Sequence, residues 1–232
     1  MTNKAHVLCA LSGPVAALAF FFGLLGAGFI PPTPPTMGVQ DILGLYRDNI
    51  TGIRLCAVAM LFLLTGLMAQ YAGLSDQIRR IQSPTARTWS TVQVTLGGIS
   101  LVPVYGSAIA WAVATYRLDR APEITQALND IGWFSLVFPV TPAFIQMIAA
   151  GFGTLSDTSP NRLFPRWYSF LCFWTAILLM TGMAIPFFRI GPFAWNGLIA
   201  FWLPAVVLGS WVNVTGLLMM RVAKRTDTKQ NL

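Results

Sequence analysis

Few residues of this 232-residue chain have side chains that catalyse reactions or bind metal ions. It holds 1 histidine, His6, and 3 cysteines, Cys9, Cys56 and Cys172. Haem ligation by two histidines needs a second histidine on a facing helix, so a bis-histidine cytochrome is excluded. The cysteines fall in apolar segments and lack the paired spacing of a zinc site. We therefore expect them to be small buried residues, and the sequence predicts no metal ion and no cofactor.

Motifs of the common catalytic mechanisms do not occur either. The chain has no serine in a nucleophile elbow, no His-Glu-x-x-His and no phosphate-binding glycine loop. Its long apolar segments have no Asp or Glu near their centres, which argues against intramembrane proton transfer. These observations favour a protein that is not an enzyme. One enzymatic hypothesis stays open, a membrane enzyme that uses Asp, Arg, Asn and Tyr side chains at the outer interface.

Polar residues at one end of the apolar segments carry the main hypothesis about a site. Three of these segments start with an asparagine and a nearby glycine, which indicates either helix capping or three copies of one ancestral hairpin. If the hairpins surround a centre, the polar residues at their outer ends form an ion-pair lid or a recognition rim there. The predicted cluster contains Asp48, Asn49, Arg54, Arg117, Asn129, Asp130, Arg189 and Asn196. Arg54 alone among them is placed inside a segment, where we expect it to snorkel to the interface or to pair with Asp48.

The elements that position these residues are membrane helices. Hydrophobic residues make up 55% of the chain and charged residues 10%, against about 25% charged in soluble proteins, and the mean hydropathy is +0.64. A helix needs about 20 apolar residues to cross a bilayer. Six segments qualify, at about 7–30, 50–74, 89–116, 131–155, 167–188 and 197–220. The sequence therefore predicts an all-α polytopic membrane protein, a single domain over residues 1–232 with six transmembrane helices in three hairpins and short loops.

Lysine and arginine predict the orientation of the helices. With six spans, one side of the membrane carries 10 basic residues and the other side carries 5. The first set is Lys4, Arg79, Arg80, Arg87, Arg162, Arg166, Arg221, Lys224, Arg225 and Lys229, and the second is Arg47, Arg54, Arg117, Arg120 and Arg189. The positive-inside rule then places both termini in the cytoplasm, and we expect a multi-pass protein of a bacterial-type inner membrane. Because the basic residues flank apolar segments, the net charge of +7 does not indicate nucleic-acid binding.

Two connections have features of their own. After Pro31 to Pro35, apolar residues recur at helical spacing, so a short amphipathic helix at about 37–47 is expected to lie in the outer interface. Pro122 begins a second short turn or helix, predicted over Glu123–Asn129. Within the fourth span, Pro139 and Pro142 must distort the helix, because proline removes a hydrogen-bond donor and clashes with the preceding turn.

Neutral polar and aromatic side chains inside the spans leave the function open. Gln70, Gln93, Gln146 and Asn213 are expected to hydrogen-bond between helices. Kinked helices and the aromatic residues of the fifth and sixth spans favour the binding or permeation of a small hydrophobic molecule. The absence of a soluble domain equally suits an accessory or scaffold subunit that packs against a larger membrane complex or against a second copy. Beyond the lipid bilayer, the sequence does not choose between these partners.

Overall fold

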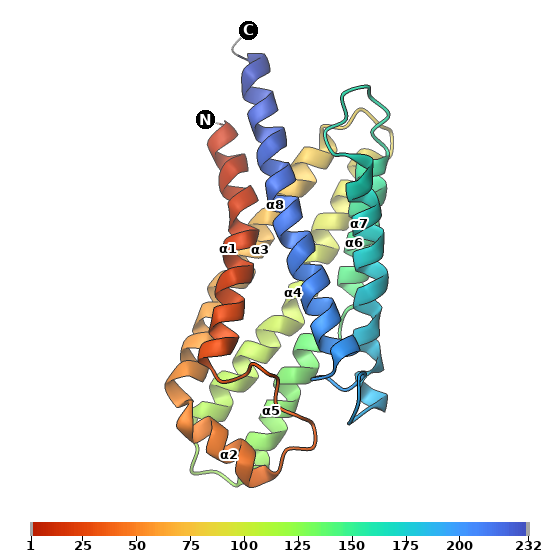
Figure 1. Cartoon of the computed structure of the whole chain (residues 1–232). Helices are drawn as coiled ribbons and strands as arrows, with labels where there is room; N and C mark the ends of the chain where they lie inside the picture. The colour runs from red at the N-terminus through yellow and green to blue at the C-terminus, as the bar shows by residue number, and fades with distance from the viewer. Residues whose placement is uncertain (1, 231–232) are drawn as a thin grey trace.

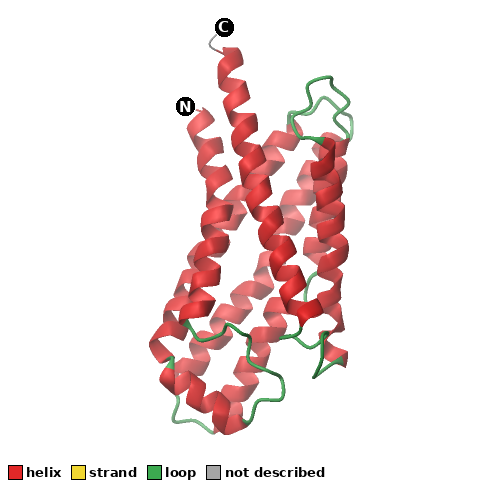
Figure 2. Ribbon diagram, viewed as in Figure 1, coloured by secondary structure: helices red, strands yellow, loops and turns green. Residues whose placement is uncertain are grey.

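The computed structural model describes residues 2–230, and side chains from residue 4 to residue 225. The side chain of Lys229, counted above for orientation, lies outside that range. The described chain consists of helices and loops without strands (Figure 2). In chain order the helices are α1 Thr2–Gly26, α2 Val39–Asp48, α3 Ile50–Arg79, α4 Ala86–Tyr116, α5 Pro122–Val137, α6 Thr141–Leu155, α7 Arg166–Leu179, the 3-10 helix η1 Met180–Phe187, the π-helix η2 Leu198–Trp202 and α8 Leu203–Gln230.

Six helical units within the described chain are long and apolar enough to cross a membrane, which confirms the predicted fold class. They cover Lys4–Gly26, Ile50–Arg79, Ala86–Tyr116, Pro122–Leu155, Arg166–Phe187 and Leu198–Arg225. Both termini lie at one end of the bundle (Figure 1), which we call the termini end. The opposite end, which we call the distal end, carries α2 and the connections 27–38, 117–121 and 188–197.

The units form a ring in chain order. Helix α1 packs on α3, α3 on α4, α4 on both α5 and α6, α6 on α7, and α7 on α8. The ring closes because α8 packs on α1, along a contact more extensive than the one between α7 and α8. Helix α3 also touches α8 and α6 across the ring. Each hairpin therefore buries its inner side chains against neighbouring hairpins, and the first and last spans pack against each other.

The fourth unit is broken where its prolines predicted a distortion. Helix α5 ends at Val137, Phe138 to Val140 form the break, and α6 starts at Thr141 with Pro142 in its first turn. Proline is well placed in a first turn, because the backbone N–H that it lacks would have no partner there. The predicted start of this unit at residue 131 is wrong, since α5 begins at Pro122. The short element expected over Glu123–Asn129 is the beginning of the same helix.

The fifth and sixth units also change their winding near the distal end. Helix α7 tightens into the 3-10 helix η1, which contains Pro186 and lies against α5 through Gly182, whose Cβ position faces the Val137 carbonyl. The sixth unit begins as the π-helix η2 before α8 continues. These irregular segments surround the connection 188–197, so the backbone departs from regular helix close to the site described below.

The connection after α1 is held against the bundle. Gly28, with φ of 71°, ends α1 while Phe29 N donates to Leu24 O at 2.9 Å and Gly28 N donates to Leu25 O at 3.1 Å. This is the Schellman arrangement, which requires a left-handed residue that glycine adopts without strain. Helix α2 follows, with Ile42, Leu43 and Tyr46 buried. The expectation of a helix here is confirmed, but its apolar face lies on α5, α3 and α4 rather than in the lipid interface.

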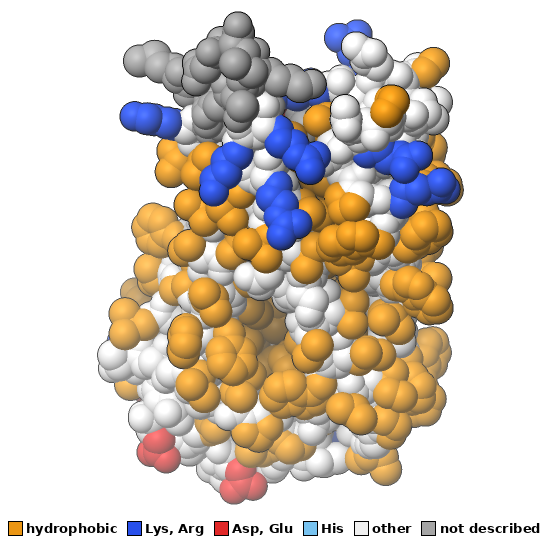
Figure 3. Space-filling model, turned by 45° about the horizontal axis from the view of Figure 1, so that its top comes forward, with side chains coloured by type: hydrophobic (Ala, Val, Ile, Leu, Met, Phe, Trp, Pro, Cys, Tyr) orange, Lys and Arg blue, Asp and Glu red, His pale blue; other side chains and the backbone are white. Residues whose placement is uncertain are grey.

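The buried side chains form two separate groups along the bundle axis. One group includes Tyr71, Tyr168 and Trp211 in the half near the termini, and the other includes Phe29, Trp111 and Trp133 in the distal half. Figure 3 shows the apolar flank of the molecule, with lysine and arginine gathered at the termini end, acidic side chains at the opposite end, and a hollow between them. Val104 of α4 is partly buried and packs against both groups.

Only some of the polar side chains inside the spans form the hydrogen bonds between helices that the sequence predicts. Gln70 Nε2 donates to Val212 O at 2.9 Å and so joins α3 to α8, as predicted. Gln146 Oε1 accepts from Ser100 Oγ at 3.5 Å. Gln93 is buried without a hydrogen-bond partner among the described residues. The expectation for Asn213 is wrong, because its exposed side chain donates to Gly209 O of its own helix.

Candidate functional site

A recess at the distal end brings together charged and aromatic side chains from three parts of the chain. It has a volume of about 240 Å³. Its walls are Pro35, Asp130, Phe134, Ile185, Pro186, Phe188, Arg189 and Trp195. We call it the distal recess. The proline-rich connection, α5 and the segment from η1 to residue 195 therefore each supply part of one site.

Hydrogen bonds hold the proline-rich connection in place beside this recess. Trp195 Nε1 donates to Thr33 O at 2.7 Å, and Trp195 is buried. Phe134 of α5 packs edge-on against Trp195, with 5.5 Å between ring centroids. Because the wall residues contact one another across chain segments, the recess does not depend on a single flexible loop.

Asn129 lies behind the wall of the recess and hydrogen-bonds to residues of three chain segments. Its Oδ1 accepts from Thr33 Oγ1 at 3.3 Å and from the Tyr46 hydroxyl at 3.3 Å. Its Nδ2 donates to Asp130 Oδ1 at 3.3 Å. Asn129 and Tyr46 are fully buried. One amide thus connects the proline-rich connection, α2 and α5, and it orients the carboxylate that faces the recess.

Opposite charges face each other in this recess. Asp130 is half-buried and Arg189 is exposed, and the charge of Arg189 acts on the Asp130 carboxyl group. A carboxylate and a guanidinium at an apolar wall recognise a polar group by charge-assisted hydrogen bonds, which are about twice as strong as neutral ones. The arrangement therefore suits a ligand with a polar end and an apolar body.

An aromatic group fills the distal half of the bundle next to the recess. The Phe29 ring lies 4.7 Å from Trp111 and 5.6 Å from Trp133, measured between centroids. Trp133 in turn meets Phe201 at 5.8 Å. Trp111 packs on Gly132, where a Cβ atom would overlap the indole ring. These four aromatic residues pack tightly in the distal half of the bundle, and none of them lines the recess.

The predicted polar cluster divides into two parts. Asp130 and Arg189 line the distal recess, Asn129 lies directly behind it, and Asn196 follows Trp195 without lining it. Asn129 and Asp130 lie inside α5 rather than at its start, so a capping role for them is wrong. Asn49 does precede α3, but its Nδ2 donates to Leu45 O at 3.0 Å, at the end of α2.

The remaining members lie elsewhere at the distal end. Arg54 Nη2 donates to Thr115 O at 2.6 Å and ties α3 to the end of α4. Among the described residues it has no salt bridge, so neither snorkelling alone nor pairing with Asp48 describes it. Arg117 lies 5.9 Å from the Tyr116 ring centroid, and Asp48 is exposed at the end of α2.

Sequence reasoning missed most of the apolar wall. Trp195 and Phe188 did not stand out among the many aromatic residues of the last two spans and the connection between them. Pro35 and Phe134 carried no signal that distinguishes them from other apolar residues. The available signal was Pro122 with Glu123 after it, a typical helix start, which would have put Asp130 and Phe134 on one continuous helix.

Six helices that are long and apolar enough to cross a membrane, joined by short connections, are compatible with a multi-pass integral membrane protein. No family model, no curated protein and no solved structure matches the chain. The role of the protein therefore has to be argued from its own residues.

Proposed function

We propose that this protein binds a small amphipathic molecule in the membrane, with the polar end of the molecule in the distal recess. The observation that carries the proposal is that Asp130 and Arg189, which have opposite charges, line a wall otherwise made of aromatic, proline and aliphatic side chains. Ligand sites usually combine an apolar lining with a few convergent polar groups. No step in this role requires a reaction, and binding or permeation without chemistry is the function we favour.

The size of the recess limits what it can hold. Pockets for complete drug-sized ligands measure about 300–1,000 Å³, and the distal recess measures about 240 Å³. It therefore has room for a ring or a head group, while an apolar tail would lie along the flank of the bundle. The hollow in that flank (Figure 3) supports this arrangement.

The proposal includes an orientation. The excess of lysine and arginine at the termini end favours a cytoplasmic location for both termini in a bacterial-type inner membrane. The distal recess would then face the outside of the cell, where it would meet molecules in the outer leaflet. Alkylation of engineered single cysteines near residues 48 and 160, with a reagent that does not cross membranes, tests this orientation.

A second candidate is an accessory subunit of a larger membrane complex. Its support is the exposed apolar segment beside the recess, in which Phe187 and Ile190 are 82% and 72% exposed. Native mass spectrometry after gentle extraction separates the two functions. A stoichiometric small molecule on the wild-type protein supports ligand binding, whereas a stoichiometric partner protein without a small molecule supports the subunit.

A further inference from the structure

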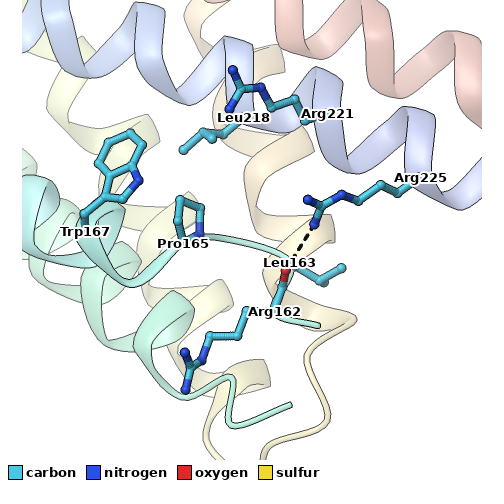
Figure 4. A pocket seen from close by; sticks show the side chains of 7 residues that line it. All are labelled: Arg162, Leu163, Pro165, Trp167, Leu218, Arg221 and Arg225. Atoms are coloured by element: carbon cyan, nitrogen blue, oxygen red, sulfur yellow. Dashed lines mark hydrogen bonds between the residues drawn. The ribbon is translucent and has the colours of Figure 1, made fainter. Parts of the chain in front are cut away.

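A second recess lies at the termini end, between the connection that precedes α7 and the side of α8 (Figure 4). It has a volume of about 200 Å³ and is lined by Arg162, Arg221, Arg225, Pro165, Trp167 and Leu218 among others. We call it the arginine recess. It shares no residue with the distal recess, so its role does not depend on the function proposed above.

Local structure brings the arginines together. Arg221 and Arg225 are four residues apart on α8, so they lie on one face of the helix. Arg162 comes from the connection, where its Nε donates to Asp157 O at 2.9 Å. Arg225 Nη1 donates to the Arg162 carbonyl at 3.3 Å, the dashed line in Figure 4. Arg225 is therefore tied to the backbone of Arg162, and all three arginines line the recess.

Among the described residues, no salt bridge neutralises the positive charge of this recess. Arginine stays charged at every accessible pH, and among the described residues none of the three forms a salt bridge. Asp157 acts on Arg162 through its charge, but its carboxylate already accepts from Ser159 and from Leu163 N. Two further cations, Arg166 and Lys224, neighbour the recess in the chain. An anion placed here would reduce the repulsion among these groups.

The remaining wall indicates where the anion comes from. Trp167 is 53% exposed and lines the recess, so an apolar surface lies beside the arginines. Tryptophan prefers the level of the lipid head groups. Helix α7 starts beside the recess with no side-chain cap, and the partial positive charge of a helix start also favours an anion.

We propose that the arginine recess binds the phosphate group of an anionic phospholipid, whose acyl chains run along Trp167. The volume of about 200 Å³ corresponds to about seven water molecules at about 30 Å³ each, which suits a phosphate ester with part of its glycerol. Basic pockets between membrane helices bind anionic head groups in this way. A phosphodiester keeps its single charge at neutral pH, so binding depends on salt rather than on pH.

The test uses native mass spectrometry of the delipidated full chain in detergent, titrated with phosphatidylglycerol, with phosphatidylcholine or with inorganic phosphate. The key variant is Arg221→Gln, because no hydrogen bond of the Arg221 side chain holds the fold among the described residues. Arg87→Gln is its control, an exposed arginine at the same end outside the recess. The triple variant R162Q/R221Q/R225Q is compared with R47Q/R87Q/R120Q, which changes the net charge equally.

We expect one phosphatidylglycerol to bind the wild type more tightly than phosphatidylcholine. Affinity should fall about fivefold for R221Q and about a hundredfold for the triple variant, while both controls bind as the wild type does. Equal affinity for the two lipids, or equal binding by R221Q and R87Q, would overturn the proposal. So would displacement of the lipid by inorganic phosphate at millimolar concentration, because that result would assign the recess to a soluble phosphate compound.

Discussion

Replacing Asn129 by leucine tests the network that holds the distal recess. The substitution removes three hydrogen bonds of 3.3 Å, to Thr33, Tyr46 and Asp130. These distances are slightly longer than the usual range, so each bond contributes about 0.5 kcal/mol, the lower part of the usual range. The buried hydroxyls of Thr33 and Tyr46 then lose their acceptor, at a cost of about 1 kcal/mol each. We expect N129L to be destabilised by about 3.5 kcal/mol in total.

Thermal unfolding in detergent micelles, followed by near-UV circular dichroism at one scan rate, measures this change. For a protein of this size 1 kcal/mol corresponds to a Tm shift of about 2–4 °C, so N129L should unfold about 7–14 °C below the wild type. Tyr46→Phe removes one hydroxyl together with its bond and leaves no unpaired group there, so its Tm should fall by only about 1–2 °C. Asn213→Leu is the matched control, since Asn213 is exposed and bonds only within α8, and its Tm should stay within about 2 °C. The network would be refuted if N129L and N213L shifted alike.

Two further substitutions test other parts of the account. Gly52→Ala places a Cβ atom against the Gly26 carbonyl at the α1–α3 contact and should lower stability by about 1–3 kcal/mol or more. Gly44→Ala is its control, in a helix with open space around the glycine, and should raise stability by about 0.5–1 kcal/mol. Equal Tm values for the two variants would contradict the close approach of α1 and α3. Burial raises the pKa of the Asp157 carboxyl, but hydrogen bonds from Ser159 and Leu163 and the charge of Arg162 outweigh it and hold this pKa below its usual value. The stability that Asp157 contributes is therefore complete above the unfolded pKa of about 3.9 and is lost as the pH falls through the folded pKa. The Tm difference between wild type and Asp157→Asn should be constant from pH 5 to pH 8 and shrink only below about pH 4. A difference that changes between pH 6 and pH 8 would contradict this role of the Asp157 carboxylate.

The spans were predictable because about 20 apolar residues in a row have few other solutions. The break at Pro139 and the helix α2 were also predictable, since proline chemistry and helical spacing are local properties. The burial of the apolar face of α2 on the bundle was not, because an amphipathic helix has the same pattern whether it faces lipid or protein. The start of α5 was misplaced because the polar residues Glu123 to Asp130 interrupt the apolar run, although they continue the same helix.

The polar cluster shows a further limit of sequence reasoning. Its eight members share one end of the bundle, but which of them meet depends on the packing of the ring and on the path of three connections. Asp130 and Arg189 line the same recess because η1, which ends two residues before Arg189, lies on α5. The arginine recess was missed for a different reason. Arg162, Arg221 and Arg225 were explained by membrane orientation, and that explanation does not reveal that two segments bring them to one place.

The measurement that tests the central claim most directly compares ligand retention by two variants with the same change in charge. D130N/R189Q alters the distal recess, while D48N/R117Q alters exposed groups at the same end that do not line it. Each protein is extracted gently from its own membrane, and bound small molecules are counted by native mass spectrometry. Since hydrogen bonds to charged groups contribute about 1.5–3 kcal/mol, D130N/R189Q should retain the co-purifying molecule at least about tenfold more weakly than the wild type, and D48N/R117Q should retain it fully. Equal retention by both variants, or a wild-type protein that carries no small molecule, would contradict ligand binding in the distal recess.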